Sequence, residues 1–207
     1  MNGVENAMPS LNTYALCSVA DVKANLDISS STWDSVFTLL INACTDWIEK
    51  YCGGRRFLSP GTDVTEYFES PFRVGDPVER TNHWLSVKSW PIISVTSVSF
   101  RSGLTPPWTG NIQPAQNYDI YPDHGQLYLR IGYPRGPQSV QVIYQGGFAT
   151  IPSDLQYACI KMVSKEFFRR KAEGKNMERS GGNQVMWNQG MEADLIDLLS
   201  AYRRIAL

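Results

Sequence analysis

The spacing of apolar residues changes twice along the chain, and this change limits the folds that the chain can adopt. Between residues 33 and 51, apolar side chains recur every three or four positions, as they do on one face of a helix. This first stripe comprises Trp33, Val36, Phe37, Leu40, Ile41, Cys44, Trp47, Ile48 and Tyr51. Ser18 with Asp21 predicts the start of a short preceding helix, and Gly53 and Gly54 predict where the longer one ends.

Helical spacing returns after Pro152, a residue that suits the first turn of a helix. The second stripe comprises Leu155, Ala158, Cys159, Met162, Val163 and Phe167, and a last helix carries Met191, Leu195, Leu198, Leu199 and Tyr202. Neither helical segment is large enough to bury its stripe alone. We therefore expect the N- and C-terminal helices to pack together, with Val36, Leu40, Cys44 and Ile48 against Leu155, Cys159 and Met162.

Between residues 62 and 147 the period falls to two, which is typical of strands. Several short strands with no helix between them predict an antiparallel sheet, sandwich or small barrel. The predicted fold is α+β, a bundle of N- and C-terminal helices with an inserted antiparallel β domain. Its predicted parts are a flexible N-terminal arm over residues 1–17, a helical bundle over 18–60 and 151–207, and the β domain over 61–150.

Charge and cysteine usage give few functional signals. The chain has 19 basic and 20 acidic residues and a net charge of -1, so its composition gives no reason to expect general binding to nucleic acid or membranes. No apolar run approaches the roughly 20 residues of a membrane span, and the N-terminus does not resemble a signal peptide. The four cysteines are scattered singly, which favours inert thiols over a disulfide or a zinc site. We expect a soluble protein that is not secreted.

The residue types that catalysis needs are sparse. His83 and His124 are the two histidines, and they fall at a strand entry and in a turn of the strand region. Glu66 and Glu69 lie three apart on a predicted strand, which places them on opposite faces rather than as an acid-base pair. Phosphate-binding, dinucleotide-binding, zinc-protease and calcium-loop motifs are missing from the sequence. We expect no catalytic residues, no cofactor and no bound metal.

Two groups of residues could contact partners. The basic residues Lys165, Arg169, Arg170, Lys171, Lys175 and Arg179 form either a solvated helix end or a surface for DNA phosphates or an acidic protein. Trp108 and Trp187 lie in polar loops, where a large aromatic is either a local plug or an interface anchor. For Trp187 we expect ordering by a partner, because its glycine-bearing loop makes a fixed conformation costly.

Several phrases, in this order, resemble the head-tail connector (adaptor) proteins of tailed bacteriophages over residues 18–172. The phrases are SVADVKANL at 18–26, WIEKYCGGRRF at 47–57, WPIISVTSV at 90–98 and IPSDLQ at 151–156. The resemblance implies a ring, commonly of twelve copies, that docks beneath the portal and extends the DNA channel. It also implies contact with the next neck or tail-completion protein, and assembly in the host bacterial cytoplasm into the virion neck.

The resemblance brings no catalytic residues, and DNA would pass the ring without sequence readout. In such proteins the C-terminal region often docks on the portal, which implies this contact for residues 191–207. The long loop around Trp108 departs from the family pattern. The candidate partner contacts are Trp108, Met186, Trp187, Leu195, Leu199, Tyr202, Arg203 and Arg204. The alternative function is a DNA-binding or packaging accessory protein that uses the basic cluster at 165–179.

Overall fold

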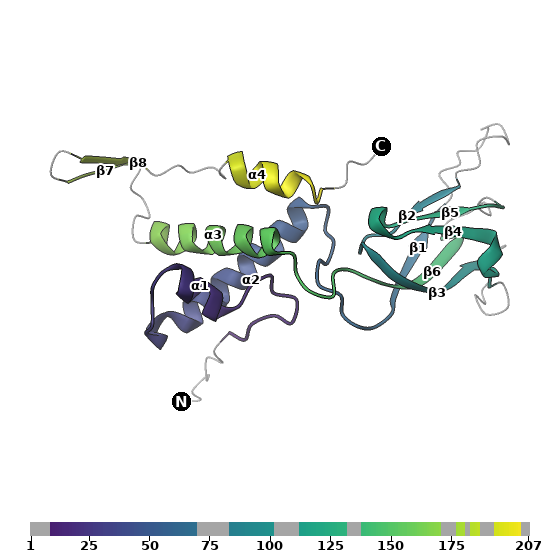
Figure 1. Ribbon diagram of the computed structural model, residues 1–207, viewed down its shortest axis with the longest axis horizontal. Helices are drawn as coiled ribbons and strands as arrows, with labels where there is room; N and C mark the ends of the chain where they lie inside the picture. The colour runs from purple at the N-terminus through teal and green to yellow at the C-terminus, as the bar shows by residue number, and fades with distance from the viewer. Residues whose placement is uncertain are drawn as a thin grey trace, which may run out of the picture. The chain divides into compact units, whose positions relative to one another are not determined.

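The computed structural model describes residues 9–69, 83–101, 112–131, 138–170, 177–180, 183–186 and 193–203. Its helices are α1 (Val19–Asn25), α2 (Asp34–Tyr51), α3 (Ser153–Arg169) and α4 (Ala193–Ser200), with 3-10 turns η1 (Ser31–Trp33), η2 (Ala115–Asn117) and η3 (Pro122–His124). Its strands are β1 (Val64–Phe68), β2 (Trp84–Ser86), β3 (Ile92–Phe100), β4 (Tyr118–Tyr121), β5 (Gln126–Leu129), β6 (Val140–Gly146), β7 (Met177–Ser180) and β8 (Asn183–Met186) (Figure 1). The predicted α+β class is confirmed.

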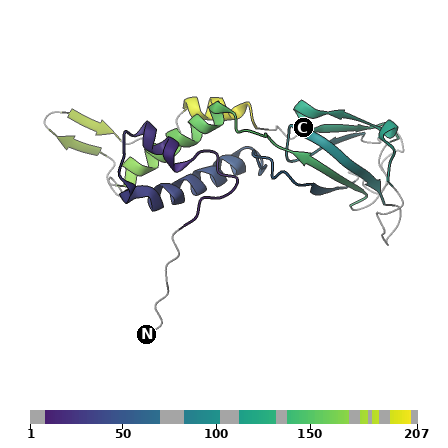
Figure 2. The same ribbon diagram turned by 60° about the horizontal axis from the view of Figure 1, so that its bottom comes forward.

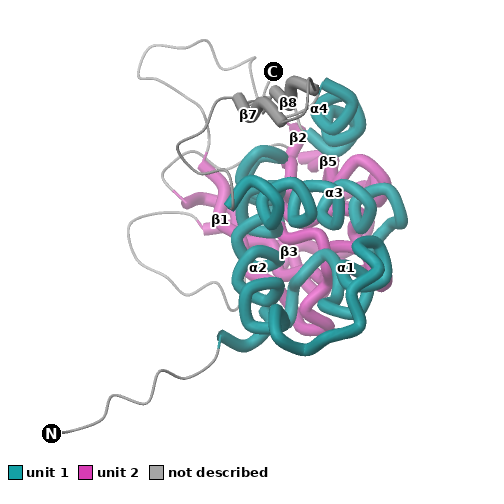
Figure 3. Tube along the Cα trace, turned by 90° about the vertical axis from the view of Figure 1, so that its left-hand side faces the viewer, with its two compact units in different colours: residues 1–55, 151–207 teal, residues 56–150 magenta. Residues whose placement is uncertain are grey.

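The chain forms two compact units. Residues 1–55 and 151–207 make up the helical unit, and residues 56–150 make up the β unit (Figure 3). Whether each unit folds as an independent domain stays a prediction.

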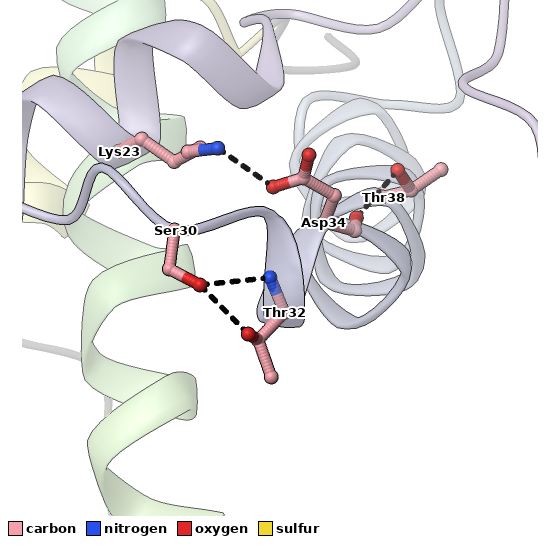
Figure 4. Close-up of polar contacts among 5 residues, drawn as sticks. All are labelled: Lys23, Ser30, Thr32, Asp34 and Thr38. Atoms are coloured by element: carbon pink, nitrogen blue, oxygen red, sulfur yellow. Dashed lines mark hydrogen bonds and ion pairs between the residues drawn. The ribbon is translucent and has the colours of Figure 1, made fainter.

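A polar cap fixes the start of α1, and an ion pair joins this helix to α2. The Ser18 hydroxyl accepts a hydrogen bond from the Asp21 amide at 3.2 Å, and the Asp21 carboxylate accepts one from the Ser18 amide at 2.8 Å. The Ser18 hydroxyl also donates to the Asp21 carboxylate at 2.7 Å, and this bond together with that from the Ser18 amide holds the pKa of Asp21 below its ordinary value. An ion pair of 2.9 Å from Lys23 to Asp34 then ties α1 to the first turn of α2 (Figure 4).

The N- and C-terminal helices pack together, as predicted. The rings of Phe37 on α2 and Phe167 on α3 have centroids 4.8 Å apart, and the Thr45 hydroxyl lies 3.9 Å from the Cys159 sulfur. Of the residues expected at the contact, Cys44, Ile48, Leu155 and Cys159 are buried, whereas Val36, Leu40 and Met162 are half-buried. The buried side of α2 is formed instead by Phe37, Thr38, Ile41, Cys44, Thr45, Ile48 and Glu49.

The described part of the expected N-terminal arm lies against α2. Asn42 accepts a hydrogen bond from the Asn12 amide at 3.0 Å and donates one to the Ser10 carbonyl at 2.9 Å. The Leu16 amide donates to the Thr45 hydroxyl at 3.2 Å, and the Leu16 side chain is buried. Residues 10–16 therefore cover one flank of α2, whereas residues 1–8 lie outside the described part of the chain.

The β unit contains two three-stranded antiparallel sheets, ordered β1-β6-β3 and β2-β5-β4. One buried cluster draws on both sheets and comprises Leu85, Val87, Ile92, Val98, Leu127, Leu129, Val140, Val142 and Tyr144. The Tyr144 hydroxyl donates to the Glu66 carboxylate and accepts from the Ser89 amide at 3.0 Å. The sheets therefore share one core, in which a buried tyrosine is fully hydrogen-bonded.

A hairpin replaces part of the loop that the sequence predicted before the last helix. Strands β7 and β8 pair antiparallel, with Met177 opposite Met186 and Ser180 opposite Asn183. Gly181 and Gly182 separate the two strands in sequence, and such glycine pairs are frequent at hairpin turns. The sequence prediction of a loop was based on the polar composition of the segment and did not use the glycine pair as a hairpin signal.

Candidate interaction surfaces

Both histidines lie in the β unit. The Nδ1 atom of His83 lies 2.6 Å from the Leu129 carbonyl oxygen, and its ring stacks on Tyr128 with centroids 5.4 Å apart. His124 lies in the η3 turn. Within the described ranges, no three His, Cys, Asp or Glu side chains gather in a way that could hold a metal ion. No helix in those ranges is both long and apolar enough to cross a bilayer.

All four cysteines are buried and free. Burial raises the pKa of Cys44 to about 12 and that of Cys52 to about 11. The hydrogen bond that Cys159 shares with Cys17, whose sulfur lies 3.5 Å away, is the main cause that raises the pKa of Cys159, and burial adds to it. The thiols of Cys44, Cys52 and Cys159 therefore stay protonated at neutral pH, which makes them poor nucleophiles and poor metal ligands.

The described members of the basic cluster already have partners in the chain. Arg169 forms an ion pair of 3.2 Å with Glu166, one turn away on α3. The half-buried Arg170 guanidinium lies 4.6 Å from the centroid of the Trp33 ring and 5.0 Å from that of Phe167. Arg179 lies on β7, and its side chain is not described. Lys171 and Lys175 lie outside the described residues. Of the cluster, Lys165 and Arg169 therefore lie one turn apart near the end of α3, and Arg170 follows directly at its C-cap.

Helix α4 contributes to the core of the helical unit. Leu195 and Leu199 are buried, and the Leu199 carbonyl accepts a hydrogen bond from the Cys52 thiol at 3.8 Å. Their side chains therefore fill this core, and their contact with a partner stays a prediction. The physical reason is that α4 packs on α3 through its apolar side, and an exposed ion pair of 2.7 Å between Asp194 and Lys161 also joins the two helices.

Other C-terminal candidates lie at the edge of the same unit. The Tyr202 hydroxyl donates to the Asp154 carboxylate at 2.6 Å, and burial together with this bond raises the pKa of Tyr202. The Arg203 guanidinium lies 5.4 Å from the centroid of the Tyr51 ring. Trp108, Trp187 and Arg204 lie outside the described residues, and Met186 ends β8 with its side chain not described.

Exposed aromatic and aliphatic side chains form surfaces that the sequence reasoning missed. On α2, Leu39 and Trp47 are exposed, and on α3 Tyr157 and Phe168 are exposed. The sequence did indicate an exposed apolar surface on α2, because the first stripe is wider than one buried helix face requires. On the β2-β5-β4 sheet, the exposed Trp84 ring lies with its centroid 5.0 Å from that of Tyr121 and 5.0 Å from that of Tyr128.

Comparison with known proteins places this fold. A chain from the solved structure "Neck of native GTA particle computed with C12 symmetry" shares the fold, with a TM-score of 0.54 and 15% sequence identity. The similarity covers 91% of this chain and 89% of that chain. No curated protein matches the sequence.

The sequence itself matches a family model. The model describes the head completion proteins, and it matches residues 15–205, nearly the whole chain. The match includes both helical segments and the inserted strands. The chain therefore belongs to the head completion protein family, and it is a structural protein rather than an enzyme.

Proposed function

We propose that the chain is a ring-forming subunit in the neck of a phage-like particle, between the portal and the next neck or tail-completion protein. The observation that carries this proposal is the family match over residues 15–205. The similar fold in a neck computed with C12 symmetry supports a ring of twelve copies. In such a ring the subunits surround the channel through which DNA passes.

The charge of the chain supports a channel that does not read sequence. The net charge is -1, so long-range attraction to a duplex is weak. Arg169 and Arg170 lie against Glu166, Trp33 and Phe167, which leaves them less available for phosphates. DNA therefore passes such a ring without base contacts, which are the contacts that specify sequence.

The assembly state of the full-length chain tests this function. We expect native mass spectrometry to find a species at twelve times the 23.3 kDa chain mass, either for the chain alone or after addition of the cognate portal protein. Electron microscopy of that species should show twelvefold rings that bind the portal. A chain that stays monomeric under both conditions and binds no portal would contradict the proposal.

The alternative, a DNA-binding accessory protein, is favoured by one observation, the basic end of α3. We expect the affinity for free duplex DNA to be weak, insensitive to sequence and strongly reduced by salt. Fluorescence anisotropy with two unrelated duplexes measures both properties. Replacing Arg169 with alanine should change binding no more than replacing the exposed Lys50 of α2. Sequence-selective binding that survives physiological salt and is lost in Arg169→Ala would favour the alternative.

A further inference from the structure

Helix α2 leaves an apolar stripe uncovered by the described parts of its own unit. The stripe, called the α2 stripe here, comprises Val36, Leu39, Leu40, Ala43 and Trp47, which follow one another at helical spacing. Leu39 is 59% exposed and Trp47 is 40% exposed. Trp47 stacks on Tyr51 with ring centroids 5.2 Å apart, which holds the indole in place. Single exposed apolar residues are ordinary, but a continuous stripe marks an interaction surface.

Helix α3 presents a second stripe, which comprises Tyr157, Lys161, Ser164 and Phe168 and is called the α3 stripe here. Tyr157 is 51% exposed and Phe168 is 50% exposed. The middle of the stripe is held by neighbouring helices, because Lys161 pairs with Asp194 at 2.7 Å and the Ser164 hydroxyl accepts from Asn25 at 3.1 Å. The exposed rings of Tyr157 and Phe168 therefore lie on either side of Lys161 and Ser164, whose side chains are held by α4 and α1.

The two stripes face in opposite directions. Helices α2 and α3 lie side by side (Figure 2) and turn their buried faces toward each other through Phe37 and Phe167. Because successive residues of a helix are about 100° apart, Leu39 lies about 180° around α2 from the buried Ile48. By the same spacing, Phe168 lies about 180° around α3 from the buried Cys159. Each stripe is therefore on the outer side of the helix pair.

We propose that the α2 stripe of one copy of this chain docks on the α3 stripe of the next copy. This inference rests on the proposed function, because a cyclic ring requires two different surfaces on every subunit, one for each neighbour. The apolar α2 stripe and the α3 stripe, whose exposed aromatic rings Tyr157 and Phe168 lie on either side of Lys161 and Ser164, are two unlike surfaces on opposite sides of the helix pair and meet that requirement. Trp47, Tyr157 and Phe168 are also of the residue class that is enriched at interface cores.

Cross-linking between the stripe centres tests the pairing. The full-length double variant Ala43→Cys, Ser164→Cys is treated with a short bis-maleimide, and the wild-type chain, whose cysteines are all buried, gives the background. We expect a ladder of linked copies that ends in a closed ring. A mixture of the two single variants should stop at dimers, and each single variant alone should stay unlinked. Dimers from one single variant alone would instead reveal a symmetric contact and overturn the proposal.

Interface variants provide a second test. Trp47→Ser and Phe168→Ser should each lose the ring while keeping the far-ultraviolet circular dichroism of the wild type. Their mixture should form a heterodimer, because each variant retains the stripe that the other lacks. Ile93→Ser, at a 52% exposed position in the β unit, is the matched control and should keep the ring.

The outcomes separate the two proposals. Rings that persist in Trp47→Ser and Phe168→Ser, or rings whose stripe centres never cross-link, would overturn the stripe pairing and leave the proposed function intact. Absence of any ring and any cross-link, with or without the portal, would overturn both.

Discussion

Replacing Phe37 with alanine is expected to lower the free energy of unfolding of the helical unit by about 3–5 kcal/mol. Phe37 is fully buried, and its ring lies 4.8 Å from that of Phe167 across the contact between α2 and α3. The substitution removes apolar surface and leaves a cavity where the two helices meet. Urea denaturation followed by helical circular dichroism measures the change, because the long helices α2 and α3 both belong to this unit.

Leu39→Ala is the matched control. Leu39 lies two residues away on the same helix but is 59% exposed, so its truncation should change the free energy of unfolding by no more than about 0.5 kcal/mol. If both variants lowered the free energy of unfolding equally, Leu39 would be as buried as Phe37, which would contradict the assignment of Phe37 to the buried face of α2 and of Leu39 to its exposed face.

The packing of the helical unit can be predicted from local periodicity, but the residues of α2 that face α3 cannot. The stripes on residues 33–51 and 155–167 predict that α2 and α3 need each other, and they do pack together. Val36 and Leu40 were expected at that contact and are half-buried instead. When an apolar stripe is wider than one buried helix face, its spacing does not indicate which of its residues contact the partner helix. On the inference above, the remaining part meets a second copy.

In the β unit, alternation predicts strands but not their partners. Val64 pairs with Tyr144 and Ile92 with Gly146, so the register depends on segments far apart in sequence. The bond from Tyr144 to Glu66 likewise joins residues whose proximity no local pattern indicates. Antiparallel pairing could be inferred from the lack of helices, whereas the division into two three-stranded sheets could not.

The candidate contact residues were chosen by type and local context, which do not report burial. Leu195 and Leu199 lie on an amphipathic helix, and the ion pair of Asp194 with Lys161 helps to turn that apolar face inward. Arg170 was expected among solvated or phosphate-binding cations, yet it covers the Trp33 ring. In both cases the contact joins segments that are distant in sequence.

Gly146→Ala is expected to destabilise the β unit by about 3 kcal/mol or more, because the added methyl has no room. Its Cβ would lie 2.2 Å from the Ser89 carbonyl oxygen and 2.7 Å from Cε2 of Tyr144. Neither neighbour can move freely, since Tyr144 is fully buried and its hydroxyl accepts a hydrogen bond from the Ser89 amide at 3.0 Å. Hydrogen exchange of the β6 amides measures the loss.

Gly61→Ala separates this steric effect from backbone strain. Gly61 has φ +69°, which alanine adopts at a cost of roughly 1–2 kcal/mol, and nothing lies within 4 Å of its would-be Cβ. Gly146 is not at a positive φ, so its expected loss arises from crowding against Ser89 and Tyr144 alone. The Gly146 variant should therefore lose β6 protection well beyond that of Gly61→Ala. Equal small losses would mean that the Ser89 turn yields, and that the close approach of β6 to this turn contributes little to the β core.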